Sequence, residues 1–219
     1  MSQNEVLSKK IPFNLRFLLF ILSILLIAAT LRSPLTGVGP IISFIQQDLG
    51  ISNLLAGFLT TIPLLAFALV SPFAPKVARR FGMEWTLFYS IILLTAGIAL
   101  RSYGNTTMLI GGTIMIGVAI AFGNVLMPSF FKLRYPLHIG ILTAIYSISM
   151  NLSSSLSAGI SYPITETALG WQGGLGASIV ISLLALIFWI PQLRGAKVSL
   201  SGGMEAKLGW SIFLRSKLA

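Results

Sequence analysis

The sequence predicts an all-α membrane protein with six transmembrane helices. Hydrophobic residues make up 55% of its 219 residues and charged residues only 9%, whereas a water-soluble domain carries roughly a quarter charged residues. The mean hydropathy is correspondingly high, at +0.91. The apolar residues gather in six segments, each close to the roughly 20 residues that a helix needs to cross a bilayer core of about 30 Å.

These segments are continuously apolar and about twice as long as the strands of a membrane barrel, so we expect helices. The first segment is long and is interrupted near its middle. Prolines lie near the ends of the second, fourth and sixth segments, where the helices are expected to stop: Pro72 and Pro75, Pro128, and Pro191. The expected spans are 15–45, 54–73, 85–101, 108–127, 139–164 and 173–191.

The basic residues predict the orientation of the spans. Of the 15 Lys and Arg residues, 13 fall in the two ends of the chain and in alternate loops, one (Arg101) in the opposite loops and one (Arg32) inside the first span. Loops rich in Lys and Arg stay cytoplasmic. We therefore expect a multi-pass protein of the cell (plasma) inner membrane with both termini in the cytoplasm, and Arg101 as an anchor at the outer interface. Because the charge lies in short loop clusters, the formal net charge of +10 does not indicate a nucleic-acid partner.

Arg32 points most directly to a function, because it lies among small and helix-breaking residues within the first span. A guanidinium near the bilayer centre costs at least about 2.5–3.5 kcal/mol, so it normally faces a cavity. All five acidic residues map to tails, loops or helix ends: Glu5, Asp48, Glu84, Glu166 and Glu205. An unpaired cation on a cavity wall suits an anionic or electron-rich solute. The alternative is that Arg32 lies shallow and extends its head group to the outer interface.

The prolines and glycines around Arg32 are expected either to open the helix beside a cavity or simply to kink it. Five residues of the fifth segment share one helix face through a 4-3-4-3 spacing: Ser147, Asn151, Ser154, Ala158 and Ser161. Such a face favours close helix packing, and Asn151 is its candidate for lining a pore.

Asn124, in the fourth segment, is open to the same two interpretations as Asn151. Tyr146 is expected either to pack in the core or to stack on a ligand. Gly111, Gly112 and Gly117 are expected to let neighbouring helices approach closely.

No constellation typical of catalysis is present in the sequence. There is no cysteine, and nothing resembles a metal cluster, a nucleophilic triad or a phosphate-binding loop. The sequence therefore predicts no enzyme activity, no catalytic residues, and no cofactor or metal. The expected partners are a small-molecule solute and the lipid bilayer.

Two stretches resemble a known family. Residues 123–132, followed by Tyr135 and Pro136, resemble the exit of the fourth helix in the cyanate and 2-nitroimidazole transporter subfamily of the major facilitator superfamily. Residues 31–40 are similar to the first helix of that subfamily. Residues 74–82 resemble, more distantly, the superfamily's loop between helices two and three, where Arg80 and Gly82 match its Arg and its second Gly.

The resemblance implies a fold of twelve helices in two six-helix bundles, each a 3+3 inverted repeat, with the solute held between the bundles and moved by alternating access. This chain resembles the amino-terminal six-helix half. The resemblance implies that Arg32 faces the substrate, and it extends the same role to Asn124 and Tyr146. Arg80 and Gly82 are implied to form a conformational loop.

The length of the chain departs from the family pattern. We expect a cytoplasmic tail at 1–14, the bundle at 15–191, and a basic linker at 192–219 that stops before a seventh helix. Six helices line one wall of a transport cavity, so a missing carboxyl-terminal half or a second chain is an expected partner. The alternative is a stand-alone six-helix module that acts as a homodimeric channel or a scaffold.

Overall fold

The computed structural model describes residues 15–193. Within this range the chain forms helices and no strand, and six helical stretches are long and apolar enough to cross a membrane, as predicted. The predicted tails at 1–14 and beyond Leu193 lie outside the described residues. The helices are α2 (Leu15–Thr36), the 3-10 turn η1 (Gly39–Ile41), α3 (Ile42–Leu49), α4 (Asn53–Val70), α5 (Ala74–Phe81), α6 (Met83–Arg101), α7 (Thr106–Arg134), η2 (Pro136–His138), α8 (Ile139–Thr165), α9 (Gly170–Gly176) and α10 (Ser178–Leu193).

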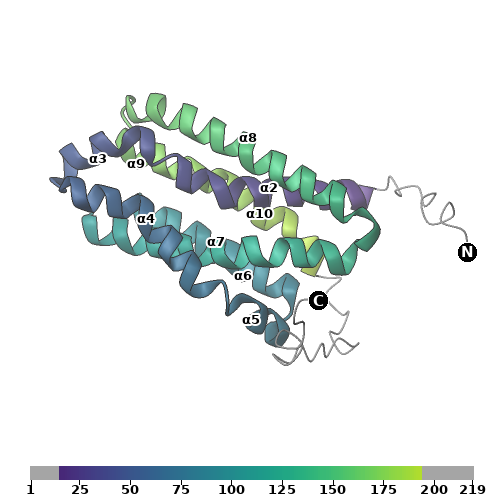
Figure 1. The fold of residues 1–219 in the computed structure, drawn as a ribbon. Coiled ribbons are helices and arrows are strands. Elements are labelled where there is room, and N and C mark those ends of the chain that lie inside the picture. Colours follow the sequence, from purple (N-terminus) through teal and green to yellow (C-terminus); the bar gives the residue numbers. More distant parts are fainter. Residues whose placement is uncertain (1–14, 194–219) are drawn as a thin grey trace, which may run out of the picture.

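The spanning helices lie side by side in one bundle, with α5 and the α7–α8 connection at one end and α3 with the α8–α9 connection at the other (Figure 1). We refer to these as the α5 end and the α3 end. The closest helix pairs are α6 with α7, α2 with α8, α4 with α7, and α10 with both α2 and α6. If the spans are numbered one to six, the packing of span one on span five (α2 on α8) matches that of span four on span two (α7 on α4). In the same way, span one on span six (α2 on α10) matches span four on span three (α7 on α6). Exchanging the first three spans for the last three thus preserves the packing, as a 3+3 repeat requires.

The first span is broken where the sequence predicts an interruption. α2 ends at Thr36, and a 3-10 turn leads into α3. Proline supplies no amide hydrogen, and the carbonyls of a last helical turn lack intrahelical donors. Side chains from other helices bond the carbonyls of Ser33 and Pro34, and these contacts hold the break in place. The sixth span is also divided, into α9 and α10.

The prediction that prolines end the even-numbered spans is correct for one span and wrong for two. α4 ends before Pro72, but α7 continues through Pro128 and α10 through Pro191. Pro128 lies on the exposed side of α7, where the loss of one backbone bond leaves the core undisturbed. Phe130 and Phe131 are buried beyond it and pack on aromatic rings of α2, α8 and α10. This packing keeps the last turns of α7 helical.

The connection between the second and third spans, interpreted from the sequence as a loop, is mostly the short helix α5. Ala74 and Ala78 are buried one turn apart, while Lys76, Arg79 and Arg80 are exposed. Gly82 ends α5 with a positive φ of 88°, a conformation that residues with a side chain rarely adopt. The match to the family loop at Gly82 therefore marks a position where the backbone requires glycine.

Glycines bring α7 close to its neighbours, as predicted. A Cβ at Gly112 would lie 2.5 Å from the Gly97 carbonyl oxygen of α6, and one at Gly117 would lie 2.7 Å from Cα of Pro63 in α4. At Gly111 the nearest atom would be 3.8 Å away, an ordinary contact. Two of the three predicted glycines are therefore close-approach positions, and they fix α7 against both α6 and α4.

Candidate functional site

Arg32 lies near the end of α2, on an exposed side of the helix. No described residue accepts a hydrogen bond from its guanidinium, and the one ion pair within residues 15–193 joins Arg134 to Glu84 instead. The described acids lie at helix ends, as predicted: Asp48 in α3, Glu84 in the first turn of α6 and Glu166 at the end of α8. Arg32 therefore presents an uncompensated positive charge on the surface of the half-bundle.

Asn124 and Tyr146 lie together. The Tyr146 hydroxyl donates a 2.9 Å hydrogen bond to Asn124 Oδ1, which joins α8 to α7. Tyr146 is only 5% exposed and Asn124 is half-buried. The pair is therefore packed between α7 and α8, and Tyr146 is not free to bind a solute. With Oδ1 occupied, the amide group of Asn124 remains as a hydrogen-bond donor beside Gly123.

α2 meets α7 at the residues that precede Arg32 and Asn124. Leu31 packs so tightly on Gly123 of α7 that a Cβ on the glycine would overlap the Leu31 side chain. Arg32 and Asn124 therefore follow two residues that are in direct contact. The arrangement brings Arg32, Asn124 and Tyr146 onto three helices that pack against one another, α2, α7 and α8.

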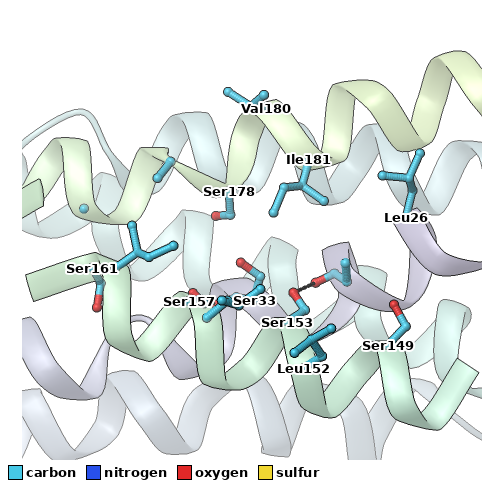
Figure 2. A pocket seen from close by; sticks show the side chains of 15 residues that line it. Leu26, Ser33, Ser149, Leu152, Ser153, Ser157, Ser161, Ser178, Val180 and Ile181 are labelled. Atoms are coloured by element: carbon cyan, nitrogen blue, oxygen red, sulfur yellow. Dashed lines mark hydrogen bonds between the residues drawn. The ribbon is translucent and has the colours of Figure 1, made fainter.

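A ladder of serines holds α8 against α2. Ser149, Ser153 and Ser157 donate hydrogen bonds of 2.8, 3.1 and 2.8 Å to carbonyls one turn apart on α2, those of Leu25, Ala29 and Ser33. Figure 2 shows these serines along α8, beside a hollow of about 490 Å³ that α8 and α10 enclose over α2. The hollow lies beside Ser33 and does not include Arg32.

The serine ladder corrects the predicted packing face of the fifth span. The packing hydroxyls follow a 4-4 spacing, whereas the predicted stripe through Ser147 and Asn151 is exposed over that part of the helix. Ser147 and Asn151 lie two residues before Ser149 and Ser153, whereas the lower part of the predicted stripe lies one residue after the ladder. Only the position of the partner helix decides which of the two faces packs. Asn151 Nδ2 bonds the Ser147 carbonyl of its own helix at 3.0 Å, so Asn151 lies on an open face, apart from the Asn124–Tyr146 pair.

Arg101 is a residue whose surroundings the sequence interpretation missed. It was expected to be an interfacial anchor, but it is 2% exposed, and its Nη1 donates a 2.8 Å hydrogen bond to the Pro34 carbonyl. Its Nε has no partner in the described chain. A cation at a helix carboxyl end is stabilised by the helix dipole. Arg101 thus caps α2 just after Arg32, and the run of prolines and glycines there was the signal that such a cap was needed.

The comparison with known proteins decides the family. A model described as the Major Facilitator Superfamily matches residues 18–219. The chain belongs to this superfamily.

Relatives confirm the subfamily that the sequence predicts. The 2-nitroimidazole transporter of Escherichia coli (strain K12) is 42% identical over 205 residues, which are 92% of this chain and 51% of that protein. The uncharacterized transporter YycB of Bacillus subtilis (strain 168) is 43% identical over 200 residues, 88% of this chain and 50% of YycB. The cyanate transport protein CynX of Escherichia coli (strain K12) is 23% identical over 170 residues, 77% of this chain and 44% of CynX. The chain spans about half the length of the curated relatives it matches.

A solved structure confirms the fold. The inward-open xylose transporter XylE of Escherichia coli superposes with a TM-score of 0.70 at 15% identity, over 78% of this chain and 47% of XylE. The six spans are therefore half of a facilitator fold, as predicted. Among the described residues no group of three or more His, Cys, Asp or Glu side chains is placed to hold a metal ion.

In this facilitator half, the two positions expected to form a conformational loop lie at the α5 end. Arg80 is exposed near the end of α5 and Gly82 ends that helix. Nearby, Arg134 of α7 lies 3.4 Å from Glu84 of α6. The loop positions are separated from Arg32, which lies towards the α3 end of α2, so the two sets of residues form distinct parts of the molecule.

Proposed function

We propose that this chain is the amino-terminal half of a permease for a small polar or anionic solute, cyanate-like in its chemistry. It forms one wall of a cavity between two six-helix bundles, and alternating access moves the solute across the membrane. Both termini and the α5 end face the cytoplasm of the plasma membrane, because Lys and Arg gather at that end.

The exposed guanidinium of Arg32 carries this proposal. A permanent cation on a membrane-spanning helix is too costly to face lipid and belongs in a polar cavity. The absence of a described carboxylate beside Arg32 leaves the charge available for a solute. On α7, which packs against α2 at Gly123, the half-buried Asn124 adds an amide donor, and Tyr146 of α8 orients that amide by its hydrogen bond to Oδ1.

The named relatives support this solute class. One is a 2-nitroimidazole transporter and another a cyanate transport protein. Cyanate is an anion, and the nitro group of 2-nitroimidazole carries electron-rich oxygens. A planar guanidinium binds both kinds of acceptor through parallel N–H groups.

A chimaera tests the proposal. Residues 18–193 would replace the matching half of the Escherichia coli 2-nitroimidazole transporter, and uptake of labelled 2-nitroimidazole and of cyanate would be measured in cells. We expect uptake by the chimaera and a loss of roughly tenfold or more in kcat/KM with Arg32→Gln, the loss that one charge-assisted hydrogen bond gives. Arg32→Lys should recover only part of it, because a lysine lacks the planar fork.

The matched control is Lys132→Gln, which removes an exposed basic residue from the α5 end of α7. Uptake by this variant should match that of the unmodified chimaera. Normal uptake by Arg32→Gln would instead assign Arg32 to the interfacial position. If the chain purified by itself forms a stable dimer that conducts ions in a bilayer, this result would favour the homodimeric channel.

A further inference from the structure

We propose that a hollow between α5 and α6 binds an acyl chain of an anionic phospholipid, with the lipid phosphate held by Arg80. This lipid site goes beyond the transport of a solute. It lies at the α5 end, on a part of the molecule separate from Arg32. We call it the α5 hollow.

The α5 hollow has a volume of about 460 Å³, and its walls come from α5, α6 and α7: Val77, Phe81, Thr86, Tyr89, Ser90, Leu93 and Phe122. Its two small hydroxyl groups are satisfied within their own helix. Thr86 donates to the Gly82 carbonyl and Ser90 to the Leu87 carbonyl, both at 2.7 Å. The walls therefore offer apolar and aromatic contact, which fits a hydrocarbon chain better than a polar solute.

A cation stands at the rim of this apolar hollow. The Arg80 guanidinium lies over the ring of Phe81, 5.5 Å from its centroid, and Phe81 is itself part of the wall. Lys76 lies on the same helix, over the ring of Phe73 at 5.7 Å. Both side chains are exposed, and neither has a described acidic partner. Positive charge next to an apolar hollow is complementary to an anionic lipid, whose charge and hydrocarbon are joined in one molecule.

The depth of the α5 hollow matches the headgroup region of a bilayer. It lies at the first turns of α6, where Trp85 stacks on Tyr89 with centroids 6.0 Å apart and also contacts Phe88. Trp and Tyr favour the level of the headgroups, where their rings meet hydrocarbon and their polar atoms meet water. Tyr89 is 58% exposed and Phe81 60% exposed, so the hollow opens outward to the lipid.

The test is a lipid titration of the purified chain, read by Trp85. The other three tryptophans, Trp171, Trp189 and Trp210, are replaced by Phe, and brominated phosphatidylglycerol or phosphatidylcholine is added to the protein in detergent. Bromine in the α5 hollow quenches the fluorescence of Trp85, which contacts the hollow residue Tyr89. We expect saturable quenching at several-fold lower concentration with phosphatidylglycerol. Arg80→Gln should raise the half-saturation concentration of phosphatidylglycerol roughly tenfold or more, as the loss of a charge-assisted hydrogen bond does.

Arg79→Gln is the matched control, because it removes an equal charge from the neighbouring exposed position of α5, whereas Arg80 is the residue that lies over the Phe81 ring of the hollow. It should raise the half-saturation concentration by no more than about fivefold, the effect of one basic residue near an anionic surface. Val77→Phe, which narrows the hollow, should weaken binding of both lipids.

Equal losses with Arg79→Gln and Arg80→Gln would overturn the proposal in favour of a diffuse basic patch. Unchanged quenching with Val77→Phe would overturn it as well, since the chain would then lie elsewhere. Saturation by phosphatidylcholine at the same concentration as phosphatidylglycerol would remove the role of the headgroup charge.

Discussion

At the end of α6 farthest from α5, the Arg101 guanidinium is enclosed by protein and bonded to the Pro34 carbonyl. Arg101→Ala should lower the free energy of unfolding by about 2–4 kcal/mol, because it leaves a void and an unbonded carbonyl at the end of α2. Denaturation in a mixed-micelle SDS titration measures this loss. Tyr103→Ala, at a residue that is 76% exposed, is the control and should change stability little.

The prolines and glycines after Arg32 signal that a cap is needed, but that the cap is Arg101 could not be read from the sequence. An arginine at the end of an apolar segment looks the same whether its head group meets water or caps another helix. The acceptor, Pro34, is far away along the chain, and only the packing of α6 on α2 brings the two together. Arg32 was easier to recognise, because a charge in mid-span is unusual whatever surrounds it.

The Tyr146–Asn124 bond can be measured by a double-mutant cycle. Tyr146→Phe and Asn124→Leu should each reduce stability, and the coupling energy should be about 0.6 kcal/mol and at most about 1.7 kcal/mol, as for other hydrogen bonds between membrane helices. The folded fraction in an SDS titration of the four proteins provides the values. A coupling near zero would show that the two side chains do not interact in the membrane.

Among the elements, α8 is bonded to α2 by three serine hydroxyl groups of its own and by the Thr36 hydroxyl of α2. Replacing Ser149, Ser153 and Ser157 together by Ala should lower stability by roughly 2 kcal/mol, about 0.6 kcal/mol for each bond. The double variant Ser147→Ala and Ser155→Ala changes the exposed stripe of the same helix and should be nearly neutral. Equal losses in the two variants, in the same SDS titration, would contradict the assignment of the packing face.

The elements themselves were largely predictable, because length and hydropathy follow from the thickness of the bilayer. All six spans and the interruption of the first lie where the sequence places them. The failures come from tertiary contacts. Pro128 and Pro191 do not end their helices, and α5 is helical although its sequence reads as a basic loop. The serine face of α8 was misplaced because periodicity gives the spacing of a stripe but not the direction of its partner.

For the whole molecule, the orientation in the membrane can be tested in a background that contains no cysteine. We expect Tyr103→Cys, at the α3 end, to react with a membrane-impermeant maleimide in intact cells. Arg79→Cys, at the α5 end, should react only after the membrane is permeabilised. The reverse pattern would place the α5 end outside and contradict the proposed cytoplasmic termini.

α4 and α8 are the least buried spans of the half-bundle. In each of them 17% of the residues in the apolar stretch are buried, compared with 56% in α7. α4 packs on α7 and α8 packs on α2, so the uncovered surface adjoins the helix that carries Arg32 and includes Asn151, which is exposed on α8. In the permease that we propose, the second six-helix bundle covers this surface and closes the cavity.

The serine ladder has a consequence for how new selectivity can arise. The three hydroxyl groups of α8 bond to backbone carbonyls of α2, which every amino acid provides. The serine side chains of α8 therefore hold most of the register between the two helices, and α2 adds one side chain, Thr36, whose hydroxyl donates a 3.2 Å hydrogen bond to the Ser154 carbonyl. A library of variants at Arg32 and its exposed neighbours should keep the same helix alignment, which makes α2 a favourable place to engineer transport of other solutes.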